Sequence, residues 1–471
     1  MPDKNAPLLE ALRGLAHSNK IPLHMPGHHR AVACLPPELP YALDATEIPG
    51  LDDLRHPEGL LRDMLARIAA IWGGAQQFCG VNGSTGAILA AIYACCKHGD
   101  TVFAARNCHK SVFHAIELCG LHPVWLEPAW LPVSGLCGSL APAALQRAFA
   151  QFPAPALCIL TSPTYEGILS DVAALAAICH THRVPLLVDE AHGAHLDFAA
   201  HAGFPAGAVR CGADLVVQSL HKTLPALGQT ALLHRQGDLI DPARLAHAFG
   251  IFQTSSPSYP LLASVDWLCA QPETQRLAWM RDWRSNLKTL RQHLAPRLLP
   301  HAAERENHIC HAIDPSKLPL DARAFGMDGA TLANALRGSD IEPEYALGHI
   351  TLLMTSCLDT PESFACLTAV LERLRLPVQQ PPLPPHPPPA MGAQVLPPGE
   401  AILMSTESVA KKHAAGRISS EYVWCCPPGI PLLAPGQRVT RELIDEIRGL
   451  EAAGCVLRQS RGANGALCVT Q

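Results

Sequence analysis

The sequence predicts an α/β fold whose large domain is built on a seven-stranded, mostly parallel β-sheet. From about residue 60, short apolar segments of strand length recur along the chain at intervals of about 30 residues. Segments with apolar residues at helical spacing, such as "VAALAAICHTH", lie between most of them. Parallel strands need crossover helices of this kind, and such a sheet is covered on both faces.

The seven expected strands share a short apolar stretch that ends in polar or small residues. In chain order they are "QFCGV", "TVFAA", "PVWLE", "ALCILTS", "PLLVDE", "DLVVQS" and "ALLH". Ligands of open α/β sheets bind beyond the carboxyl ends of the strands. Candidate functional residues are therefore expected just after each strand.

The rest of the chain divides by composition. We expect an N-terminal arm over 1–40, a large domain over 41–285 and a smaller α/β domain over 286–376. Residues 377–399 are proline-rich, which predicts a semi-rigid linker, with a PxxP ligand for a recognition module as the alternative. A C-terminal domain is expected over 400–471.

Composition excludes several classes of protein. The chain has 471 residues, of which 48% are hydrophobic and 16% charged, so it is globular. A formal net charge of −5 gives no reason to expect nucleic acid or an anionic membrane as a partner. The N-terminus shows no signal peptide and no apolar run reaches transmembrane length, which predicts a cytoplasmic protein with reduced cysteines. The 24 histidines show no set of three or four converging ligands, so no metal is expected.

The first candidate site is the segment "VNGSTGAILAA", a strand and a glycine turn that lead into a helix. Ser84 and Thr85 lie where the helix begins. Hydroxyls and unpaired N–H groups at a helix N-terminus suit an anion such as a phosphate. The alternative is an ordinary N-cap, because Ser and Thr are preferred there in any protein.

Ionisable side chains follow three other strands. Asp189 ends a hydrophobic strand, His109 follows "TVFAA", and Lys222 follows "DLVVQSLH". A lone lysine is usually a solvated surface charge. A lysine, a buried carboxylate and a phosphate cradle at the ends of one sheet are, however, the parts that a pyridoxal phosphate enzyme needs. Burial there would lower the pKa of Lys222 and make it a usable nucleophile and base.

Eight segments together resemble the Orn/Lys/Arg decarboxylases. They are "MPGHHR", "GLDDLRHPEG", "GSTGA", "RNCHKS", "SPTYEG", "VDEAHGAH", "SLHKTLPALGQT" and "TSSPSY", and the tail "GRISSEYVWCCPPGIPLLAPGQ" is similar to that family's C-terminal domain. The resemblance is to the short form, without an N-terminal wing domain. It implies the fold-type-I architecture of pyridoxal 5'-phosphate enzymes, like that of aspartate aminotransferase.

The resemblance also implies roles for single residues. Lys222 corresponds to the lysine that forms a Schiff base with the cofactor, and Asp189 to the partner of its ring nitrogen. His109 corresponds to the imidazole on one ring face, and Ala191 to the small residue on the other. His192 stands where relatives often carry Trp, near the phenolic oxygen.

Further residues match contacts to the cofactor phosphate, and a hydroxyl-rich segment matches one that relatives donate across a dimer interface. The matching phosphate contacts are Ser84, Thr85, Ser219 and His221, and the hydroxyl from the neighbouring subunit is that of Ser255 or Ser256. A homodimer or a higher oligomer is therefore implied.

The implied reaction is decarboxylation of arginine, lysine or ornithine to a polyamine-pathway amine and CO2, with a weak leaning towards arginine. Glu344 and Glu47 are candidates for binding the distal cation of the substrate, and a purely structural role is an alternative for each. Two other functions stay open: an aminotransferase or β-eliminating lyase, which would share Lys222 and Asp189, and a non-catalytic sensor that binds the cofactor. No DNA-binding module or basic patch supports the sensor.

Overall fold

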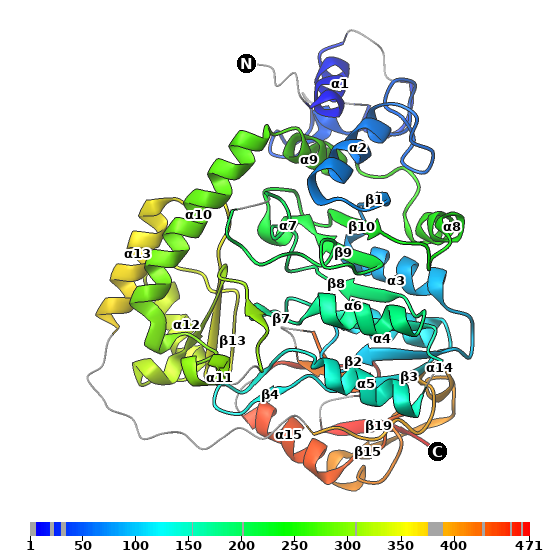
Figure 1. Cartoon of the computed structure of the whole chain (residues 1–471), viewed down its shortest axis with the longest axis vertical. Helices are drawn as coiled ribbons and strands as arrows, with labels where there is room; N and C mark the ends of the chain where they lie inside the picture. Colours follow the sequence, from blue (N-terminus) through cyan, green and yellow to red (C-terminus); the bar gives the residue numbers. More distant parts are fainter. Residues whose placement is uncertain are drawn as a thin grey trace.

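A seven-stranded sheet forms the centre of the larger part of the molecule (Figure 1). This computed structural model describes residues 6–18, 23–29, 34–152, 154–199, 202–306, 309–374, 390–425, 429–452, 455–462 and 465–471. The strands are β1 (Gln76–Gly80), β2 (Thr101–Ala105), β3 (His122–Leu126), β6 (Leu157–Thr161), β8 (Leu186–Asp189), β9 (Leu215–Ser219) and β10 (Ala231–Arg235). They correspond to the seven expected strands.

The order of the strands across the sheet is β1-β10-β9-β8-β6-β2-β3. Only β10 is antiparallel to its neighbours β1 and β9, and the other pairs are parallel. The predicted α/β class with a mostly parallel sheet is confirmed. The sequence did not predict which strand would run the other way.

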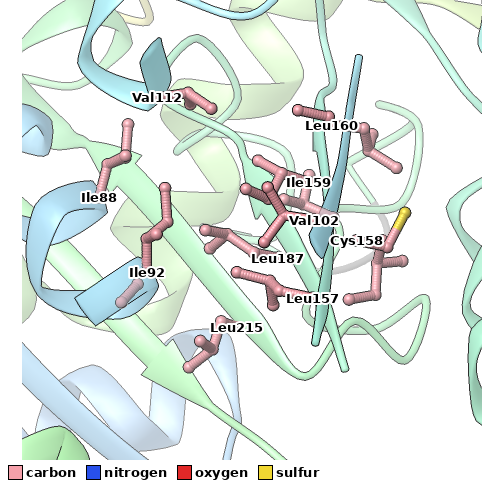
Figure 2. Packing of buried hydrophobic residues seen from close by; sticks show 14 of the residues in the cluster. Ile88, Ile92, Val102, Val112, Leu157, Cys158, Ile159, Leu160, Leu187 and Leu215 are labelled. Atoms are coloured by element: carbon pink, nitrogen blue, oxygen red, sulfur yellow. The ribbon is translucent and has the colours of Figure 1, made fainter. Parts of the chain in front are cut away.

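Both faces of the sheet are buried. Leu232 and Leu233, neighbours on β10, belong to two different hydrophobic clusters because successive side chains on a strand point to opposite faces. Figure 2 shows part of the first cluster, where Ile88 and Ile92 lie near Leu187 and Leu215 of the sheet. Helices that contribute to this cluster are α3 (Gly83–Cys95), α4 (Lys110–Leu118), α5 (Pro142–Gln151), α6 (Val172–Thr181) and α8 (Pro242–Phe252).

The second cluster lies under another set of helices. They are α1 (Pro7–Ala16), α2 (Leu60–Trp72), α9 (Tyr259–Cys269), α10 (Glu273–Leu294), α12 (Gly329–Arg337) and α13 (Pro361–Arg373). Helix α1 lies within the expected N-terminal arm. It is held by Asp266, whose carboxylate accepts the N–H of Leu8 at 3.0 Å. A helix in this arm was not expected from the sequence.

A smaller three-stranded antiparallel sheet follows α10 in the chain. Its order is β12-β14-β13, with β12 (Lys317–Asp321), β13 (Tyr345–Leu347) and β14 (Ile350–Met354). The 22-residue helix α10 runs past this region and the large sheet (Figure 1). The expected domain boundary at 285/286 falls inside α10, so the domain division stays a prediction. None of the helices in the described ranges is both long and apolar enough to cross a lipid bilayer.

The C-terminal part packs against the large domain. Its elements are α14 (Pro398–Ala401), β15 (Thr406–Ala410), β16 (Val423–Cys425), β17 (Pro431–Leu433), α15 (Arg441–Ala452), β18 (Leu457–Gln459) and β19 (Ala466–Thr470). The buried guanidinium of Arg106 donates to the carbonyls of Pro431 and Leu432. Of the predicted linker at 377–399, residues 377–389 lie outside the described residues, and the short helix α14 begins at Pro398.

Candidate active site

The register of the sheet brings the ends of several strands to one edge. Gly80 at the end of β1 pairs with Ala231 of β10, which pairs with Ser219 at the end of β9. On the other side of β9, Asp189 at the end of β8 pairs with Val217 of β9. Asp189 also pairs with Thr161 at the end of β6. The segments after β1, β8 and β9 therefore lie along the same edge, where ligands of such sheets bind.

Lys222 lies at this edge on α7 (Leu220–Thr223), a single turn that begins where β9 ends. Its Nζ lies 3.0 Å from Nε2 of His192. Burial lowers the pKa of Lys222, the charge of Lys317 adds to this effect, and the carboxylates of Asp189 and Glu344 oppose it. The amine is therefore neither a solvated surface charge nor an isolated buried one.

His192 is buried and neutral, because burial and the charges of Lys222 and Lys317 hold the pKa of its imidazole well below the usual value. Its neutral Nε2 can accept a hydrogen bond from Lys222. Its Nδ1 is buried without a hydrogen-bond partner among the described residues. One face of the ring packs on Tyr165, with ring centroids 4.2 Å apart. No role was predicted for Tyr165, although it lies in the quoted segment "SPTYEG".

Asp189 is 3% exposed, and its Oδ1 accepts the N–H of Ala191 at 3.1 Å. Burial raises the pKa of this carboxyl, and the Lys222 charge and the Ala191 hydrogen bond lower it again. A carboxylate buried at this depth needs a cationic partner. Lys222 provides part of that charge, and a protonated ligand nitrogen would provide more.

His109 is the N-cap of α4, and its Nδ1 accepts the N–H of Ser111. Burial and the charges of Lys222 and Lys110 lower the pKa of His109 to about 4. The C-terminal part covers this ring: a Cβ on Gly429 would lie 3.4 Å from Cδ2 and Nε2 of His109. Gly429 also accepts the N–H of Lys110 at 3.2 Å. The sequence did not predict this contact.

The beginning of α3 differs from an ordinary capped helix. Asn82 occupies the N-cap position and makes no side-chain cap, because its amide donates instead to the carbonyl of Phe252 at 2.9 Å. Ser84 and Thr85 lie in the first turn, half-buried and exposed respectively. The first N–H groups of a helix have no partners within it. Because Asn82 holds the N-cap position, the N-cap alternative for Ser84 and Thr85 is wrong, and anion binding at this turn stays a prediction.

Two further predicted contacts, Ser219 and His221, lie within three residues before Lys222 in the chain. Ser219 is fully buried, and its Oγ has no hydrogen-bond partner in the described part of the chain. His221 is half-buried, with Nδ1 3.1 Å from the carbonyl of Thr230. That hydrogen bond leaves the Nε2 side of the ring for another partner.

Ser255 and Ser256 are exposed and are not brought to Lys222 within one chain. Ser256 has a positive φ of 47°, and its N–H donates to Oε1 of Glu47 at 2.9 Å. Nearby, the side chain of Gln253 accepts the N–H of Val81 at 3.1 Å, so the segment begins beside the start of α3.

A buried ionic group behind His192 was not expected from the sequence. Lys317 is 0% exposed, and its Nζ lies 3.5 Å from Oδ2 of Asp314 and 3.3 Å from the carbonyl of His192. Asp314 also contacts Nε2 of His195 at 3.1 Å. Burial alone would raise the pKa of Asp314, but its interactions with His195 and Lys317 outweigh burial and hold that pKa below its usual value, so the carboxylate stays ionised. A lysine within the apolar segment "KLPL", three residues after an aspartate, was the signal available in the sequence.

The first prediction concerns this ionic group. Lys317→Met removes one cation and leaves Asp314 buried with His195 as its remaining basic partner, which should lower the free energy of unfolding by about 3 kcal/mol. Lys288→Met on the exposed side of α10 is the control. Urea unfolding followed by circular dichroism measures both variants. Equal stability of the two would show that the Lys317 charge is not needed.

The second prediction concerns pH. Because the pKa of His109 is lowered from 6.5 to about 4, its imidazole should be neutral at pH 6. The unfolded chain takes up this proton first, so the contribution of His109 to stability is complete above pH 6.5 and is lost as the pH falls towards 4. NMR of the cofactor-free protein with ¹⁵N-labelled histidine, assigned with His109→Gln, measures the titration. A charged ring at pH 6 would contradict this expectation.

Known proteins resemble this chain over nearly its whole length. It is 34% identical to the uncharacterized protein YaaO of Bacillus subtilis, over 95% of this chain and 94% of that protein. It is 30% identical to an arginine decarboxylase of the same organism, over 95% and 94% of the two chains.

Solved structures share the fold. The lysine decarboxylase LdcF of Francisella novicida superposes with a TM-score of 0.80 at 19% identity, over 99% of this chain and 81% of that one. The constitutive lysine decarboxylase of Escherichia coli gives a TM-score of 0.77 at 20% identity, over 98% and 81%.

The family comparison agrees with the segments quoted above. Residues 6–295 match the major domain of the Orn/Lys/Arg decarboxylases, and residues 385–456 match their C-terminal domain. The predicted resemblance is confirmed, and the chain belongs to the Orn/Lys/Arg decarboxylase family.

Proposed function

We propose that this protein is a pyridoxal 5'-phosphate-dependent decarboxylase that converts arginine, lysine or ornithine to the corresponding amine and CO2. The observation that carries the proposal is the placement of Lys222 at the carboxyl edge of the sheet, near buried Asp189 and in contact with His192. Arginine and lysine decarboxylases among the relatives support the same substrate class.

The residues present fit this cofactor. The Oγ of Ser219 and Nδ1 of His192 are buried polar atoms without partners among the described residues, and both would gain one from a bound ligand. Asp189 suits the protonated ring nitrogen of the cofactor. His109 and Ala191 suit its two ring faces, and His192 suits its phenolic oxygen. The residues suited to the phosphate are Ser84, Thr85, Ser219 and His221, with Ser255 or Ser256 from a neighbouring subunit.

When bound, the cofactor supplies an electron sink for the electron pair that remains on Cα after CO2 leaves. The residues of this chain supply the rest. Asp189 keeps a proton on the ring nitrogen, because an ionised carboxylate at a buried position favours a cation beside it. Lys222, with its lowered pKa, is the nucleophile before the reaction, and Lys222 or His109 donates the proton to Cα afterwards.

A direct test is to incubate the purified protein with each amino acid and to identify the products. We expect CO2 and one amine from at least one of arginine, lysine and ornithine, and none of either from Lys222→Ala. Borohydride reduction followed by peptide mapping should place the cofactor on Lys222. A label on Lys110 instead, or transfer of the amino group without CO2, would contradict the proposal and favour another pyridoxal phosphate chemistry.

We also propose a homodimer whose two sites each draw on both chains. The support is the exposed, hydroxyl-rich segment Thr254–Ser256, which matches one that relatives donate to the neighbouring subunit. The cytoplasmic location stays a prediction.

Mixing an inactive variant, Lys222→Ala, with Ser255→Ala/Ser256→Ala, which should bind the cofactor less tightly, tests the shared site. If Lys222 of one chain works with Ser255 and Ser256 of the other, a heterodimer of Lys222→Ala and Ser255→Ala/Ser256→Ala has one site with both defects and one intact site. It should regain up to half of the wild-type activity per dimer. Verified heterodimers without recovery would show that the serines serve the site of their own chain.

A further inference from the structure

Lys317 is a fully buried lysine that contacts the backbone of the candidate site. It is the first residue of β12 and pairs with Met354 of β14. Its Nζ lies near three oxygens: Oδ2 of Asp314 at 3.5 Å, Oγ of Ser316 at 3.3 Å and the carbonyl of His192 at 3.3 Å. An ammonium has three N–H donors and no acceptor, so these three oxygens can satisfy all of its donors.

The stem of Lys317 has little freedom to move. Gly167 has a φ of 92°, and a Cβ there would lie only 2.9 Å from Cγ of Lys317. The carbonyl of Gly167 accepts the N–H of Asp314 at 2.7 Å. The carbonyl of Ser316 accepts both the N–H of Thr355 at 3.2 Å and its hydroxyl at 2.9 Å. These contacts fix the segment 314–317, and the ammonium is thereby held where it donates to His192.

His192, the residue that accepts this contact, also contacts the candidate cofactor lysine. Its Nε2 lies 3.0 Å from Nζ of Lys222, and its ring packs on Tyr165 with centroids 4.2 Å apart. The imidazole is neutral, because burial and the two lysine charges hold its pKa well below the usual value. A protonated Lys222 can only donate, so Nε2 is then the acceptor and Nδ1 carries the ring proton. A continuous chain of contacts therefore runs from Lys317 through His192 to Lys222.

Charge balance alone does not require this arrangement. Asp314 already contacts Nε2 of His195 at 3.1 Å, and buried ion pairs can often be replaced by apolar side chains without loss of stability. A cation that only neutralised Asp314 would not need to reach a peptide carbonyl beside Lys222. What Lys317 adds is a fixed donor to the backbone of His192.

We infer that Lys317 is a positioning residue that acts through His192 on Lys222, an inference that rests on the proposed function of Lys222. The ammonium of Lys317 fixes the peptide of His192, and this fixes the imidazole against Tyr165. The imidazole in turn orients Nζ of Lys222 for bond formation with the cofactor. Lys317 itself contacts neither the cofactor nor the substrate in this role.

The test is a double-mutant cycle of Lys317→Met and His192→Phe. The absorbance change on adding pyridoxal 5'-phosphate to cofactor-free protein gives the rate of attachment to Lys222. Because the Lys317 charge also acts on the pKa of Lys222, rates are compared at a pH above which they no longer rise. Lys317→Met should slow attachment about 2- to 10-fold, the range for one hydrogen bond. The double variant should be no slower than His192→Phe, because both changes break the same link.

Asp314→Asn/Lys317→Met separates positioning from stability, because it removes both charges of the buried pair. We expect its urea midpoint to return towards that of the wild type, while attachment stays as slow as in Lys317→Met. A purely structural role would restore the rate together with the stability, and this result would overturn the inference. Effects of Lys317→Met and His192→Phe that multiply, or a plateau rate unchanged in Lys317→Met, would overturn it as well.

A second measurement needs no cofactor. NMR of the cofactor-free protein with ¹⁵N-labelled histidine should show His192 protonated on Nδ1 in the wild type and in Lys288→Met. In Asp314→Asn/Lys317→Met the ring should lose this single tautomer, and an unchanged His192 spectrum would overturn the inference while the proposed function stands. If borohydride reduction labels a lysine other than Lys222, the proposed function fails and the inference fails with it. The His192 spectrum distinguishes the two failures, because it does not depend on where the cofactor binds.

Discussion

The buried carboxylate of Asp189 is the constraint on which the rest of the site depends. A carboxylate that is 3% exposed at the end of a hydrophobic strand is costly unless cations lie nearby. The charge of Lys222 acts on it, and the two residues follow neighbouring parallel strands, β8 and β9, in the register that pairs Asp189 with Val217. The strand order therefore determines which lysine of the chain lies at the same edge as this carboxylate.

The positive charges of Lys222 and Lys317 are balanced by nearby carboxylates. Lys317 and Lys222 both lie near His192, and two cations so close would oppose each other without carboxylates between and around them. Asp314 binds Lys317 directly, while Asp189 and Glu344 act on Lys222. Burial and the charges of Lys222 and Lys317 keep His192 neutral, against the opposing charge of Asp314, so the ring keeps an acceptor nitrogen for Lys222. The neutral imidazole thus depends in part on two lysines that lie far apart in the sequence.

The sequence was informative where the signal was local. Periodicity located the seven strands, and the position of Lys222 after a strand together with the family segments singled it out. It was uninformative where the signal is a contact between distant segments: Tyr165 meets Glu344 across 179 residues, and no local pattern contains that pairing. The antiparallel direction of β10 was missed for the same reason, because direction depends on the connection and not on composition. The roles of the predicted cofactor contacts remain predictions.

The C-terminal part contacts residues of the candidate site directly. Gly429 lies against the ring of His109, and its carbonyl accepts the N–H of Lys110, the first residue of α4. Arg106, three residues before His109, holds the same C-terminal region through the carbonyls of Pro431 and Leu432. Since Gly429 has a φ of 81°, a side chain there would be strained as well as close to the imidazole. The backbone of the C-terminal part therefore covers one side of His109, and the burial that keeps this imidazole neutral depends on two segments that are far apart in the chain.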